Sequence, residues 1–152
     1  MDLKTINPFI ETVSEVMPQL GFDNILQKEI SYKSKKIIVS GVVLTIGIVG
    51  DKKGNVIYAI DMEGAKKIAS VMMMGMPVDE LDDMSKSALS ELSNMLTANA
   101  SIKFSGEGIN LDISVPTLIY GENIELNMNK EQITCISFVV DGINLEVNIA
   151  LD

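Results

Sequence analysis

Histidine and tryptophan are absent from this 152-residue chain, and cysteine occurs once. Without histidine, the chain has no His-based acid–base chemistry, no Ser–His or Cys–His nucleophile pair and few ligands for transition metals. The single cysteine, Cys135, lies in a β-rich run without a base or cation beside it, so we expect a buried structural thiol rather than a nucleophile. One cysteine permits no internal disulfide, which is typical of a reducing compartment.

Long apolar runs and basic charge are also scarce. No apolar run reaches the roughly 18 residues that a membrane-spanning helix needs, and the amino terminus has no signal-peptide pattern. The chain has 12 basic and 21 acidic residues, a net charge of −9, which argues against nucleic acid or anionic membrane as a partner. We therefore expect a cytoplasmic protein. The acidity alone indicates no basic partner, because moderate acidity is common and favours solubility.

The residues that are present predict a globular protein. The composition is 47% hydrophobic and 22% charged, and the length suits a single domain over residues 1–152. The order of the predicted elements indicates an α+β fold, an antiparallel sheet packed with two long helices. The predicted helices cover residues 8–20, capped by Asn7 with Pro8 first, and residues 62–75 and 83–100. The predicted strands cover residues 24–33, 36–49, 55–62, 109–115, 118–120, 124–128, 133–140 and 143–151.

Three local features refine this prediction. Gly41 and Gly47 lie inside a strand and indicate bulges or close backbone approach. Asp141–Gly142 between the last two strands is a strong hairpin signal. The sulfur-rich segment 71–76 is more typical of adaptable core packing than of an exposed methionine surface.

The predicted helix over residues 83–100 has two stripes. Its apolar face is predicted to consist of Met84, Ala88, Leu92, Met95 and Leu96. At about 100° per residue, a second stripe contains Ser87, Glu91, Asn94 and Ala98. Glu91 and Asn94 therefore point the same way, about one turn apart. An acid and an amide flanked by small residues form a surface on which another protein's site can dock.

A Glu-x-x-Asn pair is weak evidence alone, because most such pairs lie on an ordinary solvated helix face. Asparagine is a poor helix former in mid-helix, however, so Asn94 requires a reason. Ser87 lies one turn earlier on the same stripe, and Pro116 is expected close to the helix. The chain also shows a faint internal repeat. Residues 9–17 align with residues 89–96, so that Glu11 corresponds to Glu91 and Ser14 to Asn94.

These residues resemble the CheX branch of the CheC/CheX/FliY family of phosphatases, which act on the phosphorylated chemotaxis response regulator CheY. The resemblance spans nearly the whole chain, in family order, through residues 6–11, 40–43, 47–54, 65–74, 91–96 and 115–121. The family signature corresponds here to Ser87, Glu91, Asn94 and Pro116. The interval from Asn94 to Pro116 is about one residue short, and Ala98 replaces a frequent glycine.

The resemblance implies a fold with the CheC/CheX-like pseudo-repeat and specific roles for the stripe. Asn94 is expected to orient the water that hydrolyses the aspartyl phosphate, and Glu91 to pair with the partner's active-site lysine. Ser87 and Ala98 are expected to be small so that the partner can approach. The chain is expected to hold no cofactor of its own, with Mg²⁺ on the response regulator, and to form a homodimer through the sheet. Ser14 replaces the asparagine in the first half, so that copy is expected to be inactive.

Three functions remain open from the sequence: a CheY-P phosphatase, a non-catalytic module that binds a response regulator or chemotaxis adaptor, and a structural part of a flagellar or sensory complex. The intact Glu91/Asn94 pair favours the phosphatase, because a binder has no need of the asparagine.

Overall fold

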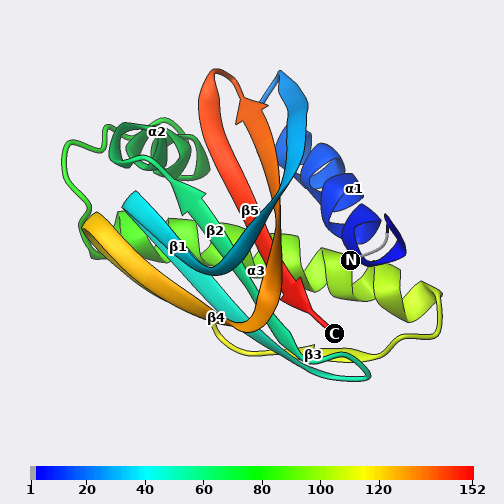
Figure 1. The fold of residues 1–152 in the computed structure, drawn as a ribbon. Coiled ribbons are helices and arrows are strands. Elements are labelled where there is room, and N and C mark those ends of the chain that lie inside the picture. The colour runs from blue at the N-terminus through cyan, green and yellow to red at the C-terminus, as the bar shows by residue number, and fades with distance from the viewer. Residues whose placement is uncertain (1–2) are drawn as a thin grey trace.

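Three helices and five strands make up the part of the chain that the computed structural model describes, residues 3–152 without the side chains of residues 129–131 (Figure 1). In chain order they are α1 (Leu3–Gln19), β1 (Ile25–Gly50), β2 (Gly54–Ile60), α2 (Met62–Met72), α3 (Asp83–Gly106), β3 (Leu111–Ile113), β4 (Thr117–Val140) and β5 (Ile143–Leu151). The strands form one sheet in the order β2-β5-β4-β1-β3, with β2 also paired to β1, and every pairing is antiparallel. The predicted α+β class is confirmed.

The two long strands, β1 and β4, pair with each other along most of their length, and each connects the two halves of the chain. Residues 41–48 of β1 face β2 and the start of β4, whereas residues 25–34 pair with residues 132–140 at the end of β4. The end of β4 in turn forms a hairpin with β5, as the end of β1 does with β2. Each half of the chain is therefore a helix followed by a long strand and a hairpin, and the two halves interlock. This arrangement confirms the pseudo-repeat.

All three helices pack on one face of the sheet. The main hydrophobic core joins buried residues of α1, α2 and α3 to alternate residues of the strands, such as Val42, Leu44 and Ile46 of β1. On the other face, a smaller cluster contains Val43, Ile57 and Ile133. Figure 1 shows α3 crossing behind the strands while β1 and β4 curve in front of them. The sheet is thus covered on both faces, and α3 has one side free.

The beginning of α1 differs from the prediction. The helix begins at Leu3, so Asn7 is not its cap and Pro8 lies inside it. Ile6, Phe9 and Val13 are all buried on one helical face, and Ile6 reaches that face only if the helix starts before it. Burial of Ile6 therefore outweighs the intrahelical hydrogen bond that Pro8, which has no N–H, cannot form.

The predicted strands over 24–33 and 36–49 are one continuous strand, and those over 118–120, 124–128 and 133–140 are another. Register shifts absorb the irregular stretches instead of ending the strands. Gly41 lies at one such shift with a φ of 131°, and a Cβ there would lie 2.3 Å from the carbonyl oxygen of Ile60. The prediction of close backbone approach at Gly41 is therefore confirmed. The Asp141–Gly142 turn also joins β4 to β5 as predicted.

Two predictions about burial were correct only in part. On the long helix, Leu92 and Leu96 are buried and Met95 packs against the core, as predicted. Met84 of the long helix is 60% exposed. The buried face of α3 consists of Ser85, Leu89, Leu92, Ser93, Leu96, Thr97, Ala100 and Phe104. Three small polar side chains belong to it because their hydroxyls bond to backbone oxygens of the same helix. The methionine segment is divided: Met72, at the end of α2, packs against the main core, whereas Met74 is 96% exposed and Met76 is 52% exposed.

No helix in the described part of the chain is long and apolar enough to cross a membrane.

Candidate functional site

The amino-terminal end of α3 is held by a capping interaction. The carboxylate of Asp82 accepts a hydrogen bond from the Ser85 backbone N–H at 2.9 Å, and the Ser85 hydroxyl donates to the Asp82 carbonyl at 3.0 Å. These bonds satisfy donors that a helix terminus leaves open. The Ser85 backbone N–H is also the main reason that the pKa of Asp82 lies below its ordinary value. The helix that carries Ser87, Glu91, Asn94 and Ala98 therefore begins at a well-defined end.

The solvent side of α3 carries the residues that the sequence singled out. Ser87 and Glu91 are exposed and Asn94 is half-buried, all on the side away from the buried face. Residues three apart on a helix have Cβ atoms about 5–6 Å from each other, so the carboxylate of Glu91 and the amide of Asn94 are neighbours. Within the described residues, neither side chain has a hydrogen-bond or ion-pair partner. Both are available to an external group.

A groove runs between α3 and the segment that precedes β4. Its volume is about 540 Å³, and its lining consists of Asp83, Lys86, Ser87, Ser90, Glu91, Asn94, Val115 and Pro116. Three of the four predicted site residues therefore line one groove, and Pro116 lies across from them as expected. Ala98 is half-buried one turn beyond Asn94 and lies outside this lining.

Ser114 fixes the wall opposite α3. Its hydroxyl accepts a hydrogen bond from the Gly47 backbone N–H at 2.8 Å and donates to the Val115 carbonyl at 3.1 Å. Its own N–H donates to the Gly47 carbonyl at 2.9 Å. Gly47 of β1 thus anchors the backbone next to Val115. The close backbone approach predicted at this glycine is not observed, because a Cβ there would meet only the Ser114 side chain, at 3.5 Å. The wall is held by the sheet although Val115 itself is 82% exposed.

Sequence reasoning missed four lining residues of this groove, of which Lys86 and Val115 are the most informative. The ammonium of Lys86 lies 4.7 Å from the ring centroid of Tyr120, so this groove-lining side chain connects α3 to β4. Ser90 and Asn94 follow Lys86 at steps of four, and this spacing was a usable signal. Val115 carried no periodic signal, because its exposure depends on the backbone anchored by Ser114.

The corresponding stripe on α1 is arranged differently. Glu11 and Ser14 are exposed, as their counterparts are. Glu11, however, lies 3.7 Å from the ammonium of Lys103 on α3, and Glu15 lies 2.9 Å from the same nitrogen. The hydrogen bond from Lys103 to Glu15 is the main cause that raises the pKa of Lys103, so this lysine stays charged at neutral pH. The acid of the first half is thus engaged within the chain.

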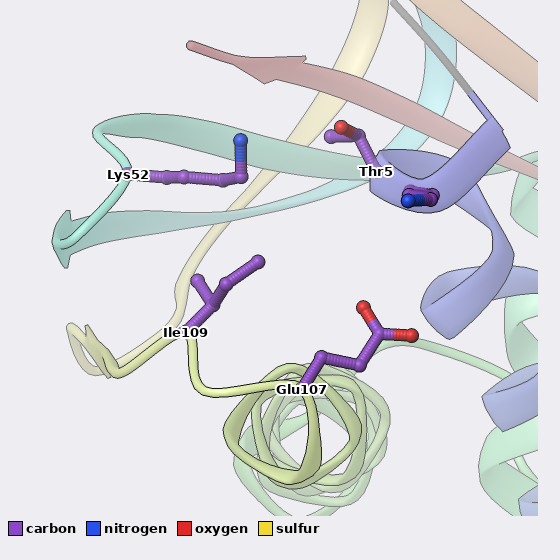
Figure 2. A pocket seen from close by; sticks show the side chains of 5 residues that line it. Thr5, Lys52, Glu107 and Ile109 are labelled. Carbon is purple, nitrogen blue, oxygen red and sulfur yellow. The ribbon is translucent and has the colours of Figure 1, made fainter.

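A second hollow, of about 410 Å³, lies at the other end of α3. Figure 2 shows Thr5, Lys52, Glu107 and Ile109 around it, contributed by α1, the β1–β2 turn and the chain after α3. Glu107 is thirteen residues beyond Asn94, which places it about 20 Å further along the helix axis. This hollow is separate from the Glu91/Asn94 groove, and its two lysines and one glutamate form no arrangement that the sequence analysis anticipated.

The described residues contain no cluster of three or more Cys, Asp or Glu side chains able to hold a metal ion. The thiol of Cys135 is buried, and burial is the main cause that raises its pKa. That environment disfavours the thiolate, which fits a structural cysteine.

Comparison with known families and sequences identifies one family. Residues 42–139 match the model of the chemotaxis phosphatase CheX family. The CheY-P phosphatase CheX of Thermotoga maritima is 34% identical over 127 residues, which cover 83% of this chain and 81% of that protein.

Solved structures share the fold over nearly the whole chain. CheX in the CheX–CheY–BeF3–Mg²⁺ complex from Borrelia burgdorferi is 30% identical, with a TM-score of 0.83 and coverage of 97% of both chains. CheX from Desulfovibrio desulfuricans is 19% identical, with a TM-score of 0.88 and coverage of 99% of this chain and 100% of the other. The second likeness concerns the fold alone.

Proposed function

The chain belongs to the chemotaxis phosphatase CheX family, and from that premise we propose that it hydrolyses the aspartyl phosphate of a CheY-type response regulator. The observation that carries the residue assignment is the pair of unpartnered side chains, Glu91 and Asn94, side by side at an open groove. The substrate class follows the relatives: the Thermotoga maritima protein is a CheY-P phosphatase, and the Borrelia burgdorferi protein forms a complex with CheY.

Asn94 is proposed to act on the water. In hydrolysis of an acyl phosphate, the water oxygen forms a bond to phosphorus while the bond from phosphorus to the aspartyl oxygen breaks, leaving a carboxylate and inorganic phosphate. The transition state is largely dissociative, so catalysis consists mainly of placing the water in line. A carboxamide accepts and donates hydrogen bonds without proton transfer of its own, which suits this task. The half-buried position of Asn94 on a long helix limits its movement and favours a defined geometry.

Glu91 is proposed to hold the partner in register. An exposed carboxylate one turn from Asn94 can pair with a lysine in the partner's site, and such a pair orients the docked helix. Ser87, one turn earlier, is small and lines the same groove, so it leaves room for the partner's surface. Ala98, one turn beyond Asn94, is proposed to do the same at the other end of the stripe. The Mg²⁺ that phosphoryl transfer requires is proposed to belong to the response regulator.

The experiment measures phosphate release from a phosphorylated CheY-type regulator, together with binding of the same regulator. Wild type is expected to accelerate release. Asn94→Ala is expected to lose about a hundredfold or more in turnover while retaining binding, since one positioned polar group contributes on that order. Glu91→Ala is expected to weaken both binding and turnover.

Matched controls are available on the first helix. Glu11→Ala and Ser14→Ala change the equivalent positions and are expected to leave both quantities unchanged. Wild type that binds the regulator without accelerating release would show a non-catalytic binding module instead.

A further inference from the structure

The groove carries an alternating charge pattern along α3. Asp83, Lys86 and Glu91 all line it, and among the described lining residues Lys86 is the one cation. The protein carries a net charge of −9, so the overall charge does not account for a lysine in a groove that also contains two acids. The position of Lys86 therefore calls for a local explanation.

Lys86 is also held in place. Its ammonium lies 4.7 Å from the ring centroid of Tyr120, which fixes a long side chain that is otherwise free to rotate. Tyr120 is 52% exposed, so the cation rests on an aromatic face without being removed from solvent. A charge restrained in this way loses less entropy on binding an anion than a free lysine does.

The distance from Asn94 decides what Lys86 can bind. The two are eight positions apart on α3, which corresponds to about 12 Å along the helix axis. A phosphoryl group that receives its water from Asn94 is too far away for Lys86 to contact. An anionic side chain on the surface beside the partner's active site is within reach.

We infer that Lys86, held against the ring of Tyr120, is a docking cation that selects response regulators with an acidic surface residue beside the phosphorylation site. This inference rests on the proposed function. Glu91 requires a positive partner group and Lys86 a negative one, so the two charges together specify one orientation of the docked regulator. A charge at the rim of an interface acts mainly on the association rate and its salt dependence.

The test compares steady-state phosphate release by wild type, Lys86→Gln, Lys86→Glu and Lys86→Arg across a range of ionic strength, with a phosphorylated CheY-type regulator as substrate. Lys86→Gln is expected to raise KM about threefold to tenfold at low salt without changing kcat, and to flatten the decline of kcat/KM with salt. Lys86→Glu is expected to raise KM further, and Lys86→Arg to behave like wild type. Lys67→Gln on α2 removes the same charge outside the groove and is expected to change neither quantity.

Tyr120→Leu provides an independent arm, because it frees Lys86 while leaving its charge. It is expected to raise KM by less than Lys86→Gln does, and Tyr120→Phe is expected to be neutral. A Lys86→Gln enzyme whose thermal stability and kcat both fall while the salt dependence stays at the wild-type value would overturn the inference and assign Lys86 a structural role. Wild type without phosphatase activity would instead refute the proposed function, so the two failures are distinct.

Discussion

The hydroxyl of Tyr58 on β2 forms a 2.8 Å hydrogen bond with the hydroxyl of Thr97 on α3, and both residues are buried. The Thr97 hydroxyl in turn donates to the Ser93 carbonyl at 2.8 Å. Thr97 lies three residues after Asn94 and about 60° from it around the helix, where the buried face meets the solvent side. The sheet therefore sets the rotation of α3 about its axis through Thr97, and with it the direction in which Asn94 points.

Tyr58→Phe is expected to lower the free energy of unfolding by about 1 kcal/mol, because it leaves the buried Thr97 hydroxyl with one partner fewer. Chemical denaturation of both proteins checks this value. Thr97→Val removes the other half of the pair and the bond to Ser93. The double variant is expected to lose less than the sum of the single losses, and strictly additive losses would contradict a direct interaction.

Tyr58 also predicts an alkaline effect on stability. Burial raises the pKa of Tyr58 well above the ordinary value, so the folded state keeps this proton at a pH where the unfolded state has lost it. Stability from this group is complete below about pH 10 and falls by about 1.4 kcal/mol per pH unit above it. Denaturation of wild type and Tyr58→Phe at pH 9 and pH 11 isolates the effect. The stability advantage of wild type is expected to shrink or reverse at the higher pH, and an advantage that stays constant would be inconsistent with a buried neutral tyrosine.

Ser114→Ala is expected to reduce kcat/KM about threefold, which corresponds to the ~0.5–1 kcal/mol of one hydrogen bond that positions a backbone segment. The hydroxyl links Gly47 to the Val115 carbonyl, so its loss loosens the wall opposite Asn94. Ser114→Thr keeps the hydroxyl and serves as the control. Equal activities of the alanine variant and wild type would show that the backbone hydrogen bond between Ser114 and Gly47 holds this wall without the Ser114 hydroxyl.

Ser14→Asn is expected not to create a second active helix. When it is combined with Asn94→Ala, phosphate release is expected to stay at the level of Asn94→Ala alone, because Glu11 is engaged by Lys103 and cannot offer a free carboxylate. Adding Lys103→Gln releases that glutamate. If the Ser14→Asn change alone restores activity, the ion pair does not account for the silent first half.

A homodimer stays a prediction from the family resemblance. Light scattering is expected to give about twice the chain mass of 16.5 kDa. Leu26, Tyr32 and Ile38 of β1 are large, apolar and more than half exposed, so Ile38→Lys is expected to shift the protein toward monomer. A monomeric mass for wild type removes the claim.

Much of this architecture was predictable from local patterns. The α+β class, the Asp141–Gly142 hairpin and the shared stripe of Ser87, Glu91 and Asn94 follow from periodicity and turn chemistry, which act within a few residues. The helix start at Leu3 was not predictable in this way, because the local signal of Asn7–Pro8 was overridden by burial of Ile6 against the distant core. Tertiary packing routinely outweighs such propensities.

The far wall of the groove was accessible only in part. Pro116 was expected near the helix, but the exposure of Val115 and the contact between Lys86 and Tyr120 depend on bonds between β1 and the segment before β4. The apolar face of α3 was predicted only in part for a related reason. Leu92 and Leu96 are buried as expected, but Ser85, Ser93 and Thr97 are buried too, with their hydroxyls bonded to backbone carbonyls, and hydrophobicity alone does not find them.

The interlocked long strands have a consequence for how the protein is made. Ile25 at the start of β1 pairs with Val140 at the end of β4, so native pairing waits until most of the chain has left the ribosome. During synthesis, α3 leaves the ribosome before β4 and β5, so the sheet against which its buried face packs is still incomplete. Contacts of such high sequence separation form slowly, because loop closure precedes the stabilisation that they provide. The half-chains are thus expected to fold together after synthesis rather than one after the other, and Asn94 acquires its orientation in that last step.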